Sequence, residues 1–208
     1  MKTLYVRFKR KAMAGQCFLI IDAQNDYLDP WDRHKVTRLV SRINEVVAAF
    51  RECGLPIVWI KTEFRADLTD AFLEMRDRNI SMVIEGGPGA DFHSELDWQP
   101  CDKTIIKKRY SAFFGSELDT YLVERGIEKL AICGINTHAC IRMSAIDAYQ
   151  RDLRVLLIED AVDSYDDEHS RVSMNYMDGK IAVVASSQDV VRSLATRVVG
   201  VDSAEWRR

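Results

Sequence analysis

The stretch Leu130-Ala-Ile-Cys-Gly-Ile-Asn-Thr-His-Ala-Cys140 decides the fold of this chain. Its apolar start predicts a short buried strand, which we expect Gly134 to end. A helical pattern follows over residues 137–151, so Cys140 is expected in the first turn of a helix. Unpaired backbone N–H groups and the helix dipole favour negative charge there, which predicts a lowered thiol pKa and a nucleophilic cysteine. The alternative is a cysteine that only packs in the core.

Strand-like and helix-like segments alternate along the whole chain. Strands are expected over Gln16–Ile21, Ile57–Thr62, Thr104–Lys107, Lys129–Cys133, Arg154–Glu159 and Ile181–Ala185. Helices are expected near Lys35–Cys53, Leu68–Asp77, Ser116–Arg125, Thr137–Arg151, Asp166–Met177 and Gln188–Val198. Several of the strands are apolar on both faces, as in a parallel sheet covered by helices. The alternation predicts an α/β fold: one three-layer, doubly wound domain over residues 1–208, with a six-stranded, mostly parallel sheet.

Composition limits the function classes. The chain has 208 residues and a formal net charge of −3, which argues against a nucleic-acid partner. The apolar run Cys17–Ile21 stops at Asp22, far short of the roughly 18 residues that cross a bilayer, so no membrane association is expected. The five cysteines form no C-x-x-C pair, which is typical of reduced thiols in a cytoplasmic protein.

Three chemically capable residues follow expected strands. Asp22 follows the first strand, Lys107 ends the third and Cys140 follows the fourth. Ligands bind beyond the carboxyl ends of the strands in such a sheet, so these side chains are expected to share one site. A carboxylate can take the thiol proton, and a lysine can keep both anions charged. Taken singly, the aspartate can be a turn residue and the lysine a solvated strand end.

These stretches also carry a family resemblance. Asp22-Ala-Gln-Asn-Asp-Tyr27 resembles the D-x-Q-N-D-[FY] motif of the isochorismatase-like cysteine hydrolase superfamily. Lys107-Lys-Arg-Tyr-Ser-Ala-Phe113 resembles its K-x-R-Y-S-A-F motif, and Cys133-Gly-Ile-Asn-Thr-His-Ala-Cys140 resembles its G-[VI]-x-T-x-x-C motif. The match spans residues 16 to about 185 and is similar to the branch of N-carbamoylsarcosine amidases and of ureidoacrylate and biuret hydrolases.

The resemblance implies roles for individual residues. Asp22, Lys107 and Cys140 would form the catalytic triad. The Ile135-Asn136 peptide bond would be cis, and the N–H groups of Asn136 and Cys140 would form the oxyanion hole. Weaker candidates for lining the substrate pocket are Gln24, Arg65, Tyr110, Phe113 and His138.

The resemblance also implies what is absent. Nicotinamidases carry a D-x-H-x-H metal site, whereas the corresponding stretch here, Lys61-Thr-Glu-Phe-Arg-Ala-Asp67, has no histidine. We therefore expect no catalytic metal, no other cofactor and no nicotinamidase activity. Members of the superfamily are commonly dimers or tetramers, and Trp31, Trp98 and Trp206 fall in expected surface segments, so a homo-oligomer is expected.

The leading hypothesis is a cysteine hydrolase that cleaves a C–N bond of a small amide, carbamoyl or ureido substrate through a thioester on Cys140. Two alternatives stay open. One is an isochorismatase-type vinyl-ether hydrolase that uses Asp22 without the cysteine. The other is a non-catalytic binding member of the fold.

Overall fold

The computed structural model describes residues 15–199, and of the side chains those of residues 15–196. Trp206 lies outside this range, as do both ends of the single domain expected over residues 1–208. Six parallel strands form one sheet in the order β3-β2-β1-β4-β5-β6. They are β1 (Gln16–Ile21), β2 (Ile57–Thr62), β3 (Lys103–Lys107), β4 (Lys129–Ile135), β5 (Arg154–Asp163) and β6 (Val183–Ala185).

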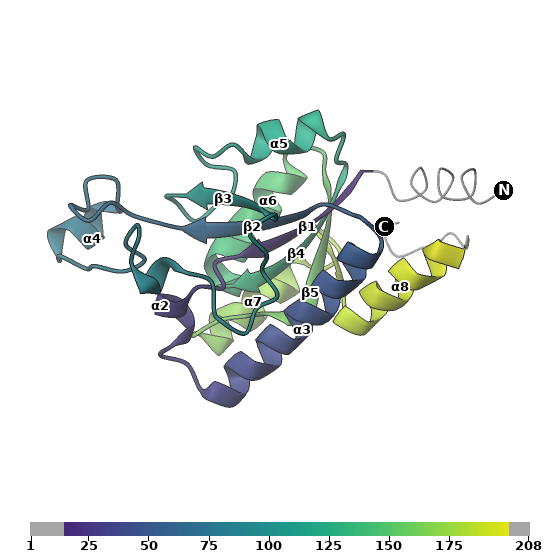
Figure 1. Cartoon of the computed structure of the whole chain (residues 1–208), viewed down its shortest axis with the longest axis horizontal. Coiled ribbons are helices and arrows are strands. Elements are labelled where there is room, and N and C mark those ends of the chain that lie inside the picture. The colour runs from purple at the N-terminus through teal and green to yellow at the C-terminus, as the bar shows by residue number, and fades with distance from the viewer. Residues whose placement is uncertain (1–14, 200–208) are drawn as a thin grey trace.

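Helices cover both faces of the sheet. In Figure 1, α3 (Arg33–Glu52) and α8 (Ser187–Val199) lie together below the sheet, and α5 (Leu118–Glu124) and α6 (Arg142–Tyr149) lie above it. The remaining helical segments are α2 (Asn25–Leu28), α4 (Leu73–Asp77), the 3-10 turn η1 (Pro88–Ala90), the π-helical turn η2 (Thr137–Ile141) and α7 (Asp167–Met177). The three-layer, doubly wound α/β fold is therefore confirmed.

The sheet interior is apolar because its central strands have helices on both faces. Every residue of β1 is buried, and Phe18 on this strand stacks on Phe50 of α3 with ring centroids 5.1 Å apart. Asp32 is the N-cap residue of helix α3, and its side chain accepts a hydrogen bond from the N–H of Lys35. Within residues 15–199 no helix is both long and apolar enough to cross a membrane.

Gly134 does not end the fourth strand, contrary to the sequence prediction. Strand β4 continues to Ile135, and Gly134 adopts φ +108 where the register with β5 shifts. A Cβ atom at this position would lie 2.0 Å from the carbonyl oxygen of Ile21 on β1. The glycine therefore allows a bulge and a close approach of two strands, rather than a chain reversal.

Several other boundaries differ from the predictions, and β5 runs past the expected Glu159 to Asp163. The segment expected as one helix from Leu68 forms α4 only from Leu73 onward, and β6 is shorter than expected. The helix expected over residues 137–151 is two elements, because η2 precedes α6. The N–H of Ile141 donates to the carbonyl of Asn136, five residues earlier, which defines the wide turn.

Candidate active site

Asp22, Lys107 and Cys140 lie together at the carboxyl edge of the sheet. Asp22 follows β1 and has φ +57, in the left-handed region that non-glycine residues seldom adopt. Lys107 is the last residue of β3, and Cys140 lies in η2 after β4. The strand order β3-β2-β1-β4 brings these three chain segments, far apart in sequence, to neighbouring positions.

The ammonium group of Lys107 connects the carboxylate to the thiol. Its Nζ lies 2.7 Å from Oδ2 of Asp22 and donates to Sγ of Cys140 at 3.5 Å. The lysine and aspartate side chains are 1% and 2% exposed, so the pair lies out of water. Nζ also donates to the Thr62 hydroxyl at 2.7 Å, and that hydroxyl donates to Oδ1 of Asp22 at 2.9 Å. A buried cation with this many partners has a fixed position.

The pKa values of this cluster follow from burial and charge. Burial alone would lower the pKa of Lys107, but the Asp22 carboxylate and the hydrogen bonds of the ammonium outweigh burial and raise the pKa above its usual value. Burial and, next to it, the Asp22 carboxylate raise the pKa of the Cys140 thiol to about 12, although Lys107 opposes the rise. The lysine is therefore charged and the cysteine protonated at neutral pH.

The lowered thiol pKa predicted from sequence is therefore wrong for the resting protein. Cys140 is only 8% exposed and lies beside a carboxylate, and these two effects exceed what one helix terminus supplies. A thiol in this state needs a base to become a nucleophile. Asp22, ion-paired through Lys107, is the carboxylate placed to act as that base.

One backbone feature that the family resemblance implied is present before the cysteine. The peptide bond between Ile135 and Asn136 is cis. Asn136 directly precedes η2 and is its N-cap residue. Its carbonyl accepts hydrogen bonds from the N–H groups of Ala139 and Ile141 at 3.0 and 3.2 Å. The assignment of the Asn136 and Cys140 N–H groups as an oxyanion hole stays a prediction.

A cavity of about 740 Å³ opens above these residues. Six of the residues predicted for the site line it: Asp22, Lys107, Tyr110, Asn136, His138 and Cys140. Most of the remaining wall is aromatic or apolar, and Asp26, Thr62 and Arg109 add polar groups to it. Nδ1 of His138 lies 2.6 Å from the Ser164 hydroxyl, and burial lowers the pKa of this histidine.

Three predicted pocket residues lie outside the cavity lining. The buried side chain of Gln24 bonds to the backbone of Thr62 and Ala90. Phe113 is buried in the core, with the guanidinium of Arg151 4.5 Å from its ring centroid. Arg65 is exposed. Gln24 therefore stabilises the backbone and Phe113 packs in the core, while Arg65 is a solvated side chain.

Sequence reasoning missed three polar residues of the site, one of which, Asp26, lies inside the D-x-Q-N-D-[FY] stretch. Thr62 is the last residue of β2, and the same argument that selected Asp22 and Lys107 from strand ends would have selected it. Arg109 lies inside the K-x-R-Y-S-A-F stretch, two residues after Lys107, and it lines the cavity. The position of Arg109 in a recognisable motif was the available signal for this residue.

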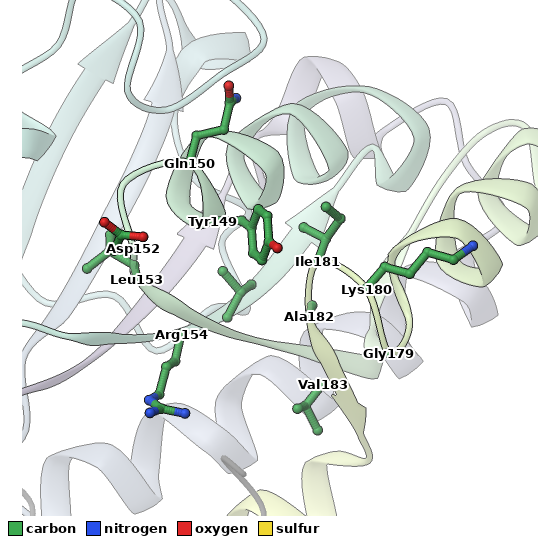
Figure 2. Close-up of a pocket in the computed structure, with 11 residues that line it drawn as sticks. Tyr149, Gln150, Asp152, Leu153, Arg154, Gly179, Lys180, Ile181, Ala182 and Val183 are labelled. Atoms are coloured by element: carbon green, nitrogen blue, oxygen red, sulfur yellow. The ribbon is translucent and has the colours of Figure 1, made fainter. Parts of the chain in front are cut away.

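A second hollow, of about 460 Å³, lies at the amino-terminal end of β5 and β6. Figure 2 shows Tyr149 beside Ile181 in this hollow, with Asp152, Arg154 and Lys180 around them. None of the triad residues lines it. Within residues 15–199 no group of three His, Cys, Asp or Glu side chains could hold a metal ion. The larger cavity is lined by the triad and is the candidate active site.

With the geometry in place, the family of the chain follows from its sequence. The sequence model of the isochorismatase domain family matches residues 16–189 of this chain. The chain therefore belongs to the isochorismatase family of hydrolases. The crystal structure of an isochorismatase family protein from Desulfovibrio vulgaris is similar, with a TM-score of 0.80 and 26% identity over 88% of this chain and 99% of that one. N-carbamoylsarcosine amidase from Thermoplasma acidophilum gives a TM-score of 0.71 and 25% identity over 83% and 96%.

Curated relatives in this family differ in activity. The ureidoacrylate amidohydrolase RutB of Azorhizobium caulinodans is 27% identical over 174 residues, which is 72% of this chain and 77% of that protein. A probable inactive nicotinamidase of Arabidopsis thaliana is 32% identical over 152 residues, 69% of this chain and 78% of that protein. Family membership therefore does not by itself decide between an active enzyme and an inactive one.

Proposed function

We propose that this protein is a cysteine hydrolase that cleaves a C–N bond of a small amide, carbamoyl or ureido substrate through a thioester on Cys140. One observation carries the proposal: the buried Lys107 ammonium lies 2.7 Å from the Asp22 carboxylate and 3.5 Å from the Cys140 sulfur. A protein that only binds a ligand gains nothing from burying three ionisable groups together, because their burial costs stability. The amide-cleaving relatives, RutB and N-carbamoylsarcosine amidase, are consistent with this chemistry.

In the acylation half of the reaction, Asp22 takes the proton of the Cys140 thiol as sulfur attacks the carbonyl carbon of the substrate. Lys107 stabilises the thiolate as it forms, since its ammonium is already within 3.5 Å of the sulfur. The oxyanion of the tetrahedral intermediate accepts hydrogen bonds from the N–H groups of Asn136 and Cys140. The C–N bond then breaks, and the leaving nitrogen receives the proton held by Asp22.

In the second half, water hydrolyses the thioester. Asp22 removes a proton from the water as its oxygen bonds to the acyl carbon, and the carbon–sulfur bond breaks. The Asp22 proton then returns to the sulfur, which restores the neutral thiol and releases the acid. No redox step or added group is needed, so the proposal includes neither a metal nor another cofactor.

Intact-protein mass spectrometry during turnover tests the proposal. Purified protein would be screened against small amides, carbamoyl compounds and ureido acids, scored by ammonia release, and the best substrate used for trapping. A covalent adduct is expected on the wild type and on Cys101→Ala, whose thiol is exposed and remote from the triad, but not on Cys140→Ala. Full activity in Cys140→Ala would favour vinyl-ether or other chemistry by Asp22 alone, and inactivity of the wild type on every class would favour a binding protein.

A further inference from the structure

Among the residues that the structure describes, one arginine, Arg109, lines the active-site cavity. Of the charged groups lining it, Asp22 and Lys107 neutralise each other at 2.7 Å. The Asp26 carboxylate accepts the N–H of Val83 at 2.6 Å. Within the described part of the chain, Arg109 has no carboxylate within ion-pair distance. A cationic side chain that is half-buried in a pocket without a counter-ion can form an ion pair with an anionic ligand.

The guanidinium of Arg109 is held in a fixed orientation. Its Nη1 donates to the carbonyl oxygens of Asp70 at 2.9 Å and of Lys108 at 2.6 Å. The same group lies 4.9 Å from the ring centroid of Phe72, which also lines the cavity. These contacts occupy one nitrogen and one face of the guanidinium, and the structure gives Nε and Nη2 no acceptor among residues 15–199. An Nε and Nη2 edge matches the two oxygens of a carboxylate.

The position of Arg109 relative to the triad suits a second functional group on the same substrate. Nζ of Lys107 donates to the backbone carbonyl of Arg109 at 3.1 Å as well as to the sulfur of Cys140. The arginine backbone is thus one hydrogen bond from the reaction centre, while its guanidinium packs on Phe72, which also lines the cavity. A cavity of about 740 Å³ holds more than the amide group that reacts.

We infer that Arg109 binds a carboxylate carried by the substrate, which makes the substrate an anionic amide or ureido acid rather than a neutral amide. This inference rests on the proposed function for its reacting group, but the binding of the carboxylate is a separate property. Because the arginine is held before the ligand arrives, it loses little side-chain freedom on binding. Arg109 would contact the carboxylate and not the bond that breaks, so it should contribute mainly to KM.

Asp26 is the group that favours a different substrate. Its carboxylate lines the same cavity and would attract an ammonium group. It already accepts a backbone N–H from Val83 and lies in the first turn of α2, where backbone N–H groups stabilise negative charge. The hydrogen bonds of the Arg109 side chain, within the described residues, go to backbone carbonyls. The anionic ligand is therefore the better complement, and a cationic substrate is one of the outcomes to be tested.

The test compares three amides of matched shape: succinamate, butyramide and β-alaninamide, whose ends are anionic, neutral and cationic. Wild-type protein is expected to hydrolyse succinamate with a kcat/KM about 10²-fold or more above that for butyramide. Arg109→Gln should remove most of this preference by raising KM for succinamate, while kcat/KM for butyramide stays within about threefold. Arg109→Lys should keep part of the preference. Arg65→Gln, which removes an exposed arginine outside the cavity, should leave it unchanged.

Binding to the Cys140→Ala protein separates this inference from the proposed function. Ligand-observed NMR should show succinamate bound in preference to the other two amides, and the preference should disappear in the Cys140→Ala/Arg109→Gln double variant. If the wild type hydrolyses none of the three amides, the binding measurement alone decides whether Arg109 binds the carboxylate. The lack of hydrolysis then counts against the proposed chemistry and not against the role of Arg109. Equal binding of all three amides, preference for β-alaninamide, or the same loss in Arg65→Gln as in Arg109→Gln would overturn the role of Arg109.

Discussion

The side-chain amide of Gln24 and the backbone of Thr62 are joined by two hydrogen bonds of 2.8 Å. Nε2 of Gln24 donates to the carbonyl of Thr62, and Oε1 accepts the N–H of the same residue. Nε2 also donates to the carbonyl of Ala90 at 2.8 Å. Because the Thr62 hydroxyl contacts both Asp22 and Lys107, this amide fixes the residue that connects the two charged members of the triad.

Gln24→Ala is therefore expected to lower both stability and activity. The change leaves one buried N–H and two buried carbonyls without partners, which should cost roughly 2 to 4 kcal/mol in the free energy of unfolding. Urea denaturation would measure the loss. Asn25→Ala is the matched control, because its exposed side-chain amide donates one hydrogen bond, to Pro88, and does not contact Thr62. Equal losses in both variants would contradict the role assigned to Gln24.

Lys107→Met should slow acylation by on the order of 10² or more, because the developing thiolate loses its cation. Lys108→Met is the control: that lysine pairs with Asp70 at 2.9 Å, and its side chain is 36% exposed. Single-turnover kinetics with a substrate found in the screen would give the rates. If Lys108→Met removes activity and Lys107→Met keeps it, the alignment to the K-x-R-Y motif is wrong by one residue.

Alkylation of Cys140 should follow the raised thiol pKa. In the wild type the reaction with iodoacetamide is expected to rise roughly tenfold per pH unit from pH 7 upward without levelling near neutrality. Asp22→Asn removes a charge that raises the pKa and keeps Lys107, so alkylation at pH 8 should become faster while amide hydrolysis is lost. Peptide mass spectrometry would follow Cys140, with the exposed Cys101 as internal reference. A wild-type rate that levels near pH 7 would contradict the raised pKa.

A homo-oligomer is expected from the apolar surface as well as from the family resemblance. Trp98 is 40% exposed, and other large apolar side chains are more exposed still, including Leu73, Phe114 and Tyr165. Burying such side chains between subunits removes apolar area from water. Light scattering at micromolar concentration checks the mass, and a value near 23.8 kDa would rule the oligomer out at that concentration.

The fold was predictable from sequence because the strands of a parallel sheet are apolar throughout and the breaks between them are polar or contain glycine. Strands β1 and β2 match their predicted ranges, Gln16–Ile21 and Ile57–Thr62. Gly134 was misread because a glycine at a bulge and a glycine at a turn give the same sequence signal. Which of the two applies depends on the neighbouring strand, here Ile21 of β1.

The grouping of Asp22, Lys107 and Cys140 was predictable because each lies at or just after the end of a strand. The state of the thiol was not, since it depends on burial and on the carboxylate beside it, and neither is visible in the local sequence. Pocket lining was predicted poorly for a similar reason. Gln24 and Arg109 lie in motifs of equal prominence, and only the direction of each side chain separates a structural amide from a pocket cation.

Thr62 and Lys107 are paired positions of β2 and β3, and β3 is the outermost strand on its side of the sheet. The ammonium that the triad needs is thus carried by the strand with hydrogen bonds to only one neighbour, where backbone opening costs least. Brief fraying of β3 would separate the cation from the carboxylate and the sulfur while the central strands stay intact. Catalytic turnover should then fade at urea concentrations below those that unfold the protein, in step with hydrogen exchange along Lys103–Lys107.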